Sequence, residues 1–177
     1  MMDEKVESAI RENKGFVVIL AGSDSDVTHV NGLSEALRKY QLPHQVRIYS
    51  AHKQPPDLVK TIIAYDKIPG TLAYIAVAGG TDALSGTASF RSSHPVISCP
   101  PDAPNDTCTK NPPGSSNAYI PKPQNAARFI AQMFSGLPDT PYRKILEEEI
   151  TRKIISLETA DARFSKYPYE SQPEVKK

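Results

Sequence analysis

The chain has 177 residues, of which 39% are hydrophobic and 23% are charged, and its formal net charge is +1. This composition is typical of one folded globular domain with an extension, and it excludes the disordered and fibrous classes. A net charge this small produces no broad field that attracts nucleic acid or an anionic membrane, so we expect neither as a partner. Any phosphate that binds must be held locally.

The first residues and the cysteines narrow the class of protein further. Residues 1–14 mix acidic and basic side chains without an apolar segment, so we expect a polar leader and neither a secretory signal nor a membrane anchor. The expected location is the cytoplasm. Cys99 and Cys108 are expected to be free thiols, with Cys99 packed in the core. The four histidines are scattered and no CxxC or HxxxH spacing occurs, so no metal site is predicted.

Apolar runs alternate with helical patterns along the first two thirds of the chain. Four runs are predicted as strands: 16–20, 46–49, 71–78 and 95–99. Three segments between them are predicted as helices: 27–40, 55–65 and 83–90. The apolar positions that should face the sheet recur every three or four residues: Val27, Val30, Leu33, Leu37 and Tyr40 in the first helix, and Leu58, Ile62 and Tyr65 in the second.

This alternation implies a parallel sheet with helices on both faces, because each connection crosses over and returns the chain in the same direction. We therefore predict an α/β fold, a three-layer αβα sandwich with a flavodoxin-like parallel sheet. Ligands bind such sheets beyond the carboxyl ends of the strands. The polar turns 22–26, 50–53 and 78–86 all follow strands, so we expect them to meet at that edge.

The remainder of the chain is predicted to be a loop, a helix and an extension. Residues 101–120 are rich in Pro, Asn, Ser and Gly and should form a loop over the site. A helix over 123–134 completes a domain at 15–138, followed by a helical extension at 139–164, assigned to oligomerisation, and a flexible tail at 165–177. Apolar residues follow one face of the extension: Leu146, Ile150, Ile154, Leu157 and Phe164. Either a neighbouring subunit buries this stripe or the helix packs back on its own sheet.

Each polar turn has both a functional and a purely structural interpretation. In the first turn, Ser23, Ser25 and the backbone amides can bind a phosphate and Asp26 can accept from ribose hydroxyls. Ser25 or Asp26 can equally supply the N-cap oxygen of the helix that follows. The turn is neither GxGxxG nor GxxxxGKS, so the usual markers of dinucleotide binding and nucleoside triphosphate hydrolysis are missing.

The second and third turns add a proton carrier, a cation and a flexible backbone. The imidazole of His52 can accept or donate a proton, and Lys53 beside it can hold a phosphate. A lone histidine in a loop is often only a surface residue. Gly79 and Gly80 allow the backbone to approach a ligand closely, or they simply make a tight turn.

Together these turns resemble the aminoimidazole ribonucleotide (AIR) carboxylase family, whose pattern is GS-x-SD, then SAH with a basic residue, then AGG or AGR followed by ALSG. The resemblance covers about Val17 to Phe134, and it is supported by VISCPP at 96–101, by Pro112-Pro113-Gly114 and by the helix residues 124–127. It implies an enzyme of purine synthesis that forms tetramers or octamers, with sites near subunit boundaries.

The family has two branches, which differ in the second and third turns. A mutase branch, which moves a carboxyl group from the N5 carbamate to C4 of the imidazole, looks like SAHR with AGGAAHLPG, with a histidine where this chain has Ala83. The other branch uses carbon dioxide directly and looks like SAHK with AGRSNALSG and SCPP. This chain matches the second branch at Lys53, at 83–86 and at 98–101.

Three residues depart from that branch: Gly80, Thr81 and Asp82 stand where it has Arg, Ser and Asn. The chain is therefore either an enzyme with a retuned site or a divergent paralogue, and we expect Asp82 to place a negative charge near the carbon dioxide. Lys110, aligned with a family arginine in the mobile loop, keeps one cation available.

The resemblance implies carboxylation of AIR at C4 by carbon dioxide without metal, biotin, ATP or other cofactor, because C4 of the aminoimidazole is nucleophilic. His52 would then remove the C4 hydrogen. The residues expected to bind substrate are Gly22, Ser23, Ser25, Asp26, Ser50, Ala51, Lys53, Gly79, Gly80, Thr81, Asp82, Ala83, Leu84 and Lys110. The alternatives are the mutase, a non-catalytic ribonucleotide-binding paralogue and a flavodoxin-like module for another phosphorylated ligand.

Overall fold

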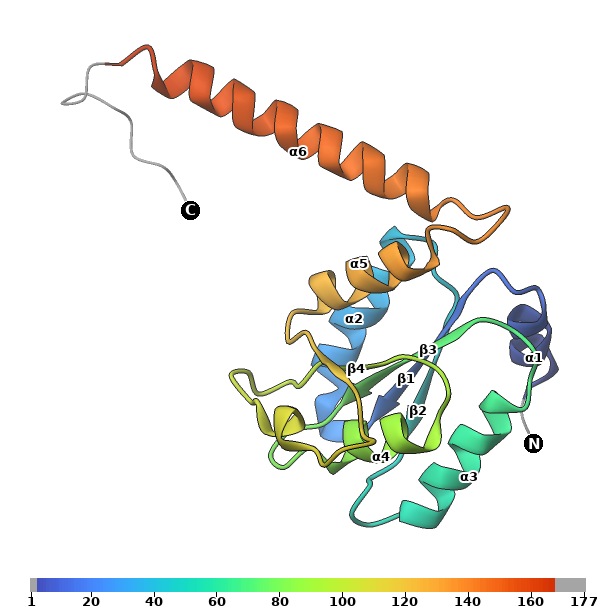
Figure 1. Ribbon diagram of the computed structural model, residues 1–177. Coiled ribbons are helices and arrows are strands. Elements are labelled where there is room, and N and C mark those ends of the chain that lie inside the picture. Colours follow the sequence, from blue (N-terminus) through green and yellow to red (C-terminus); the bar gives the residue numbers. More distant parts are fainter. Residues whose placement is uncertain (1–2, 168–177) are drawn as a thin grey trace.

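The computed structural model describes residues 3–167, which form a five-stranded sheet with helices on both faces (Figure 1). The strands are β1 Phe16–Ala21, β2 His44–Ile48, β3 Leu72–Val77, β4 Val96–Ser98 and β5 Ala118–Tyr119. The helices are α1 Glu4–Arg11, α2 Val27–Lys39, α3 Pro55–Asp66, α4 Ala83–Arg91, α5 Pro123–Phe134 and α6 Tyr142–Phe164, with short 3-10 turns η1 Asp24–Asp26 and η2 Thr107–Lys110.

The sheet has the order β2-β1-β3-β4-β5, and every neighbouring pair is parallel. All residues of β1 and β3 are buried, as their continuous apolar sequences predicted. Alternate residues of β1 face opposite sides: Val17 and Ile19 pack with α2, α5 and the start of α6, whereas Val18 and Leu20 pack with α1, α3 and α4. The predicted three-layer αβα sandwich with a flavodoxin-like sheet is confirmed.

Three elements differ from the sequence-based expectation. Helix α1 lies inside the predicted polar leader, where Asp3 caps it by accepting from the Lys5 amide at 2.8 Å and Ile10 is buried in the core. The short strand β5 lies inside the predicted loop 101–120. Val27 was expected to face the sheet but is 56% exposed, because η1 precedes α2 and sets the direction in which its first residue points.

Helix α6 projects away from the body of the molecule (Figure 1). Its first two turns are anchored: Tyr142 and Leu146 are buried, and the Tyr142 hydroxyl donates to the Lys14 carbonyl at 2.7 Å. Beyond them, Ile150, Ile154 and Leu157 are 45%, 49% and 57% exposed. The helix therefore does not pack back on its own sheet over most of its length, and the alternative that it does so is wrong.

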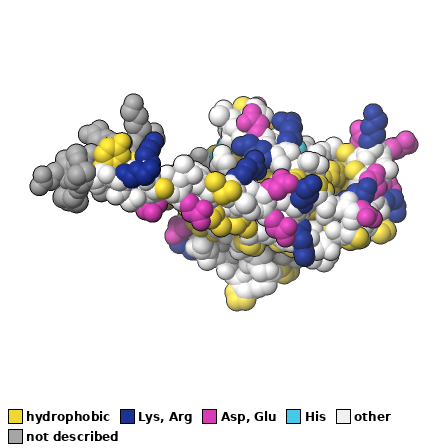
Figure 2. All heavy atoms as spheres, turned by 90° about the horizontal axis from the view of Figure 1, so that it is seen from above, with side chains coloured by type: hydrophobic (Ala, Val, Ile, Leu, Met, Phe, Trp, Pro, Cys, Tyr) yellow, Lys and Arg dark blue, Asp and Glu magenta, His cyan; other side chains and the backbone are white. Residues whose placement is uncertain are grey.

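Charged side chains of both signs are interspersed with apolar ones on the face seen from above (Figure 2). None of the helices within 3–167 is both long and apolar enough to span a membrane. The part of the predicted flexible tail that follows Tyr167 lies outside the described residues.

Candidate functional site

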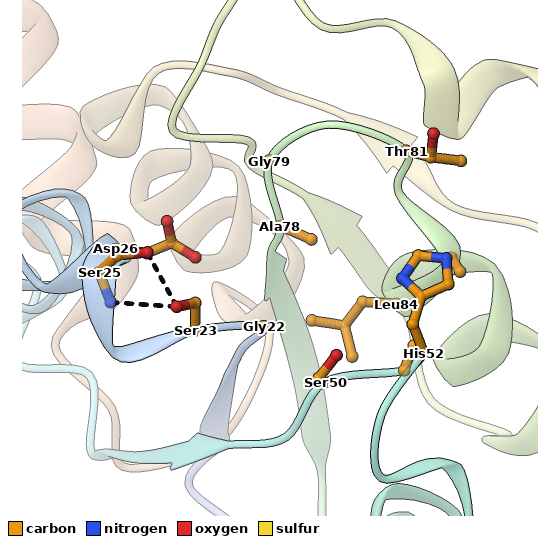
Figure 3. A pocket seen from close by; sticks show the side chains of 12 residues that line it. Gly22, Ser23, Ser25, Asp26, Ser50, His52, Ala78, Gly79, Thr81 and Leu84 are labelled. Carbon is orange, nitrogen blue, oxygen red and sulfur yellow. Dashed lines mark hydrogen bonds between the residues drawn. The ribbon is translucent and has the colours of Figure 1, made fainter.

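The three polar turns meet at the carboxyl edge of the sheet, around a cavity of about 260 Å³. Parallel pairing brings them together, because β1, β2 and β3 are neighbours that end on the same side. The cavity is lined by Gly22, Ser23, Ser25, Asp26, Ser50, Ala51, His52, Ala78, Gly79, Thr81, Ala83 and Leu84. Figure 3 shows Ser23, Ser25 and Asp26 on one side and His52 on the other, with Ala78 and Gly79 between them and Ser50 nearer to His52.

Most of the predicted site residues line this cavity, and four do not: Lys53, Gly80, Asp82 and Lys110. Ala78, the last residue before the double glycine, lines the cavity but was not predicted as a site residue. Its position at the end of the third apolar strand was the signal that could have identified it. The volume lies close to the lower end of the roughly 300–1,000 Å³ usual for small-molecule sites, which suits one small ligand.

The first turn leaves Asp26 available to a ligand. The Ser23 hydroxyl accepts from the Ser25 amide at 3.2 Å and from the Ser25 hydroxyl at 2.8 Å, so Ser23 caps η1 (Figure 3). Asp26 precedes α2 but its carboxylate makes no capping hydrogen bond. The prediction that Ser25 or Asp26 caps the helix is therefore wrong. Partial burial raises the pKa of Asp26, and the neighbouring His29 opposes that rise.

The second turn presents a histidine without a partner. Among the described residues, no hydrogen bond to the His52 ring is found, and the ring is exposed where it lines the cavity. Ser50 shapes the turn, since its hydroxyl accepts from the Lys53 amide at 3.3 Å and its carbonyl from the Gln54 amide at 2.8 Å. The Lys53 side chain is exposed outside the cavity lining.

Asp82 in the third turn faces the protein interior. It is only 4% exposed, and its carboxylate accepts from the Ser85 amide at 2.9 Å and from the Ser98 hydroxyl at 2.6 Å. These bonds cap α4 and join it to β4. The expectation that Asp82 places a negative charge beside the ligand is therefore wrong, because both carboxylate oxygens are held by the fold.

Lys110 lies away from the cavity. It belongs to η2, its side chain is 71% exposed, and its Nζ lies 3.7 Å from Asp106 Oδ1. Within the lining, the acidic and basic side chains are those of Asp26 and His52.

Two further features lie outside the cavity lining. His29 Nε2 is 3.4 Å from Cys99 Sγ, and burial lowers the pKa of His29 while it raises the pKa of the Cys99 thiol to about 12. Cys99 and Cys108 are both buried free thiols.

A larger hollow of about 810 Å³ lies between β4, β5 and α5, but its lining contains no His, Asp, Glu, Lys or Arg. Among residues 3–167, no cluster of three or more potential ligands for a metal ion occurs.

The fold and the site define an α/β protein with a small polar cavity at the carboxyl edge of a parallel sheet. A family model described as AIR carboxylase matches residues 16–153, and the chain belongs to that family. It is 32% identical over 165 residues to a human bifunctional phosphoribosylaminoimidazole carboxylase/phosphoribosylaminoimidazole succinocarboxamide synthetase, a match that covers 89% of this chain and 39% of the human protein. The chain thus spans less than half the length of that relative.

One curated relative and one solved structure, both from Treponema denticola, are matched over more of their own length. A phosphoribosylaminoimidazole carboxylase is 33% identical over 128 residues, covering 68% of this chain and 79% of that protein. The crystal structure of Treponema denticola PurE superposes with a TM-score of 0.78 at 28% identity, covering 84% of this chain and 97% of that structure.

Proposed function

We propose that this protein carboxylates 5-aminoimidazole ribonucleotide at C4 with carbon dioxide, giving 4-carboxy-5-aminoimidazole ribonucleotide for purine biosynthesis. The observation that carries the proposal is the meeting of the three turns in one cavity, with His52 opposite Ser23, Ser25 and Asp26. Membership of the AIR carboxylase family and relatives named phosphoribosylaminoimidazole carboxylase support it.

His52 is proposed as the general base. Attack of C4 on carbon dioxide leaves that carbon tetrahedral and still bonded to hydrogen, so a base must take this proton to restore the aromatic ring. A neutral imidazole accepts it, and the electron pair of the C–H bond returns to the ring. Within residues 3–167 no hydrogen bond reaches the His52 ring, which leaves both ring nitrogens available to a ligand from this part of the chain.

The other cavity residues are proposed to position the substrate. Ser23 and Ser25 would bind the 5′-phosphate through hydroxyls and amides, and Asp26 would accept from the ribose hydroxyls. The third turn would receive the carbon dioxide or the new carboxylate through backbone amides. Lys53 lies just outside the lining and would contribute its charge to the phosphate from the rim.

The choice of carbon dioxide over the N5 carbamate depends on the third turn. A histidine that the mutase branch carries in this turn is replaced by Ala83, which lines the cavity. His52 is therefore the histidine of the lining, and one histidine is sufficient for the single proton transfer of direct carboxylation.

The test of His52 is the substitution His52→Asn. We expect the variant to bind AIR as the unaltered protein does but to lose turnover about 100-fold or more, the usual effect of removing a general base. His94→Asn is the matched control, because His94 precedes β4 and so lies at the amino end of that strand, whereas the cavity lies at the carboxyl ends. Unchanged turnover in His52→Asn would remove this residue from the mechanism.

We also propose that the exposed stripe of α6 is buried by a second copy of the chain, within a tetramer or octamer. Ile150, Ile154 and Leu157 recur at helical spacing and are each about half exposed. Ile154→Glu should shift the sedimentation coefficient toward smaller species, whereas Ser156→Glu, which points to a different side of the same helix, should not. Identical assembly states for both variants would contradict the role of this stripe.

A further inference from the structure

Three side chains of the loop 101–110 clasp the third turn. The Asp102 carboxylate accepts from the Gly80 amide at 2.8 Å, and the Asn105 side-chain amide donates to the Gly80 carbonyl at 2.7 Å and to Asp102 at 2.9 Å. The Thr107 hydroxyl accepts from the Asp82 amide at 3.0 Å. We call Asp102, Asn105 and Thr107 the clasp. Both peptide groups of Gly80 are thus fixed by side chains more than twenty residues away in the sequence.

The clasp engages alternate amides of the turn. The amides of Gly80 and Asp82 bond to it, whereas those of Gly79 and Thr81 find no protein acceptor within the described residues. Gly79 and Thr81 are also the members of the turn, between 79 and 82, that line the cavity. Gly80 has a φ of +67°, in the left-handed region that glycine adopts at low cost. The turn therefore divides its donors between the loop and the ligand cavity.

We propose that Asp102 is a positioning residue: through the Gly80 amide it holds the turn so that the Gly79 and Thr81 amides stay free for the carboxylate of the carboxylated ribonucleotide. The inference rests on the proposed function. Asp102 also packs against the turn, since a Cβ at Gly79 would lie 3.4 Å from its carboxyl group. The hydrogen bond from the Gly80 amide, followed by that from Asn105, lowers the pKa of Asp102, which keeps the carboxylate an acceptor at neutral pH.

The test is Asp102→Asn, which keeps the shape of the side chain. The Gly80 amide and the Asn105 side chain donate to different oxygens of Asp102, and asparagine replaces one of these oxygens with an NH₂ group that cannot accept, so at least one bond of the clasp is lost. We expect affinity for the carboxylated ribonucleotide to fall about tenfold and affinity for AIR to fall less than about threefold, measured by calorimetry. The Gly80 amide resonance should also move upfield in ¹H–¹⁵N spectra, because its charge-assisted hydrogen bond is weakened.

A matched control is Asp139→Asn, which removes the same charge at an exposed residue whose φ of 55° suits asparagine. It should leave both affinities unchanged. Equal weakening of both nucleotides by Asp102→Asn, or an unmoved Gly80 resonance, would overturn the clasp while leaving the proposed function intact. If the unaltered protein binds neither nucleotide, the proposed function is wrong, and the proposed role of Asp102 is wrong with it.

Thr107→Val provides a second variant in case Asp102→Asn does not fold. It removes the oxygen that accepts from the Asp82 amide. The same selective loss of affinity for the carboxylated nucleotide supports the clasp, and equal affinities for both nucleotides, unchanged from the unaltered protein, contradict it.

Discussion

Gly70 is the position where the structure tolerates an added methyl group least. A Cβ built there would lie 2.2 Å from the Ile10 carbonyl oxygen and 2.9 Å from Ile10 Cγ2. The nearest atom belongs to the backbone at the end of α1, which cannot rotate away as a side chain would. We therefore predict that Gly70→Ala displaces α1 from the sheet.

The magnitude follows from the packing that is lost. Ile10 is 1% exposed, and releasing an isoleucine of this burial to water costs about 1.5–3 kcal/mol. Retaining α1 in place against the new methyl group would instead cost about 1–3 kcal/mol in overpacking. By either route, the free energy of unfolding should fall by about 2 kcal/mol, which for a domain of this size lowers the melting temperature by roughly 4–8 °C.

The assay is urea denaturation followed by circular dichroism, with Gly32→Ala as the matched control. Gly32 lies inside α2 and a Cβ there would meet nothing within 4 Å, so alanine should stabilise the helix by about 0.5–1 kcal/mol. The two substitutions make the same chemical change and are predicted to have opposite signs. A Gly70→Ala variant as stable as the unaltered protein would refute the docking of α1.

Two further predictions concern polar contacts that join elements. The Tyr40 hydroxyl donates to Glu149 at 2.8 Å, and burial, followed by this bond, raises the pKa of Tyr40 to about 12. The stability that this hydrogen bond contributes is fully present below pH 10 and is lost as the pH rises toward 12. Tyr40→Phe should therefore lower the free energy of unfolding by about 1 kcal/mol at pH 7 and flatten its pH dependence between pH 10 and 12. Parallel curves for the two proteins above pH 10 would contradict this. Ser98→Ala leaves the buried Asp82 carboxylate without one donor and should cost about 1–3 kcal/mol in chemical denaturation, whereas a loss below about 0.5 kcal/mol would mean that Asp82 finds another partner.

The sheet and the cavity could be predicted from the sequence because their signals are local. Buried parallel strands are continuous apolar runs. The polar residues that follow them must lie at one edge of the sheet, because right-handed crossover connections make the strands parallel. Helix α1 was harder to predict, because a helix with one fully buried residue, Ile10, resembles a polar leader in composition. Its capping residue Asp3 and the spacing of Val6 and Ile10 were the available signals.

The loop over the site could not be predicted in detail. Its position depends on side chains that bond to the backbone of distant residues, such as Asp102 to Gly80, and no periodicity marks such contacts. The same limit applies to Asp82. Whether an aspartate before a helix caps it or faces a ligand depends on a partner such as Ser98, which lies on a different strand.

In the proposed reaction, carbon dioxide is joined to C4 of AIR in the cavity at the carboxyl edge of the sheet. The most direct test supplies AIR with ¹³C-bicarbonate in one reaction and the N5 carbamate in another, and follows the C4 carboxylate by ¹³C NMR. We predict that labelled carboxylate forms from AIR at a rate proportional to protein concentration, and that His52→Asn lowers this rate about 100-fold or more. Product from the N5 carbamate alone would identify a mutase, and product from neither substrate would contradict a catalytic role.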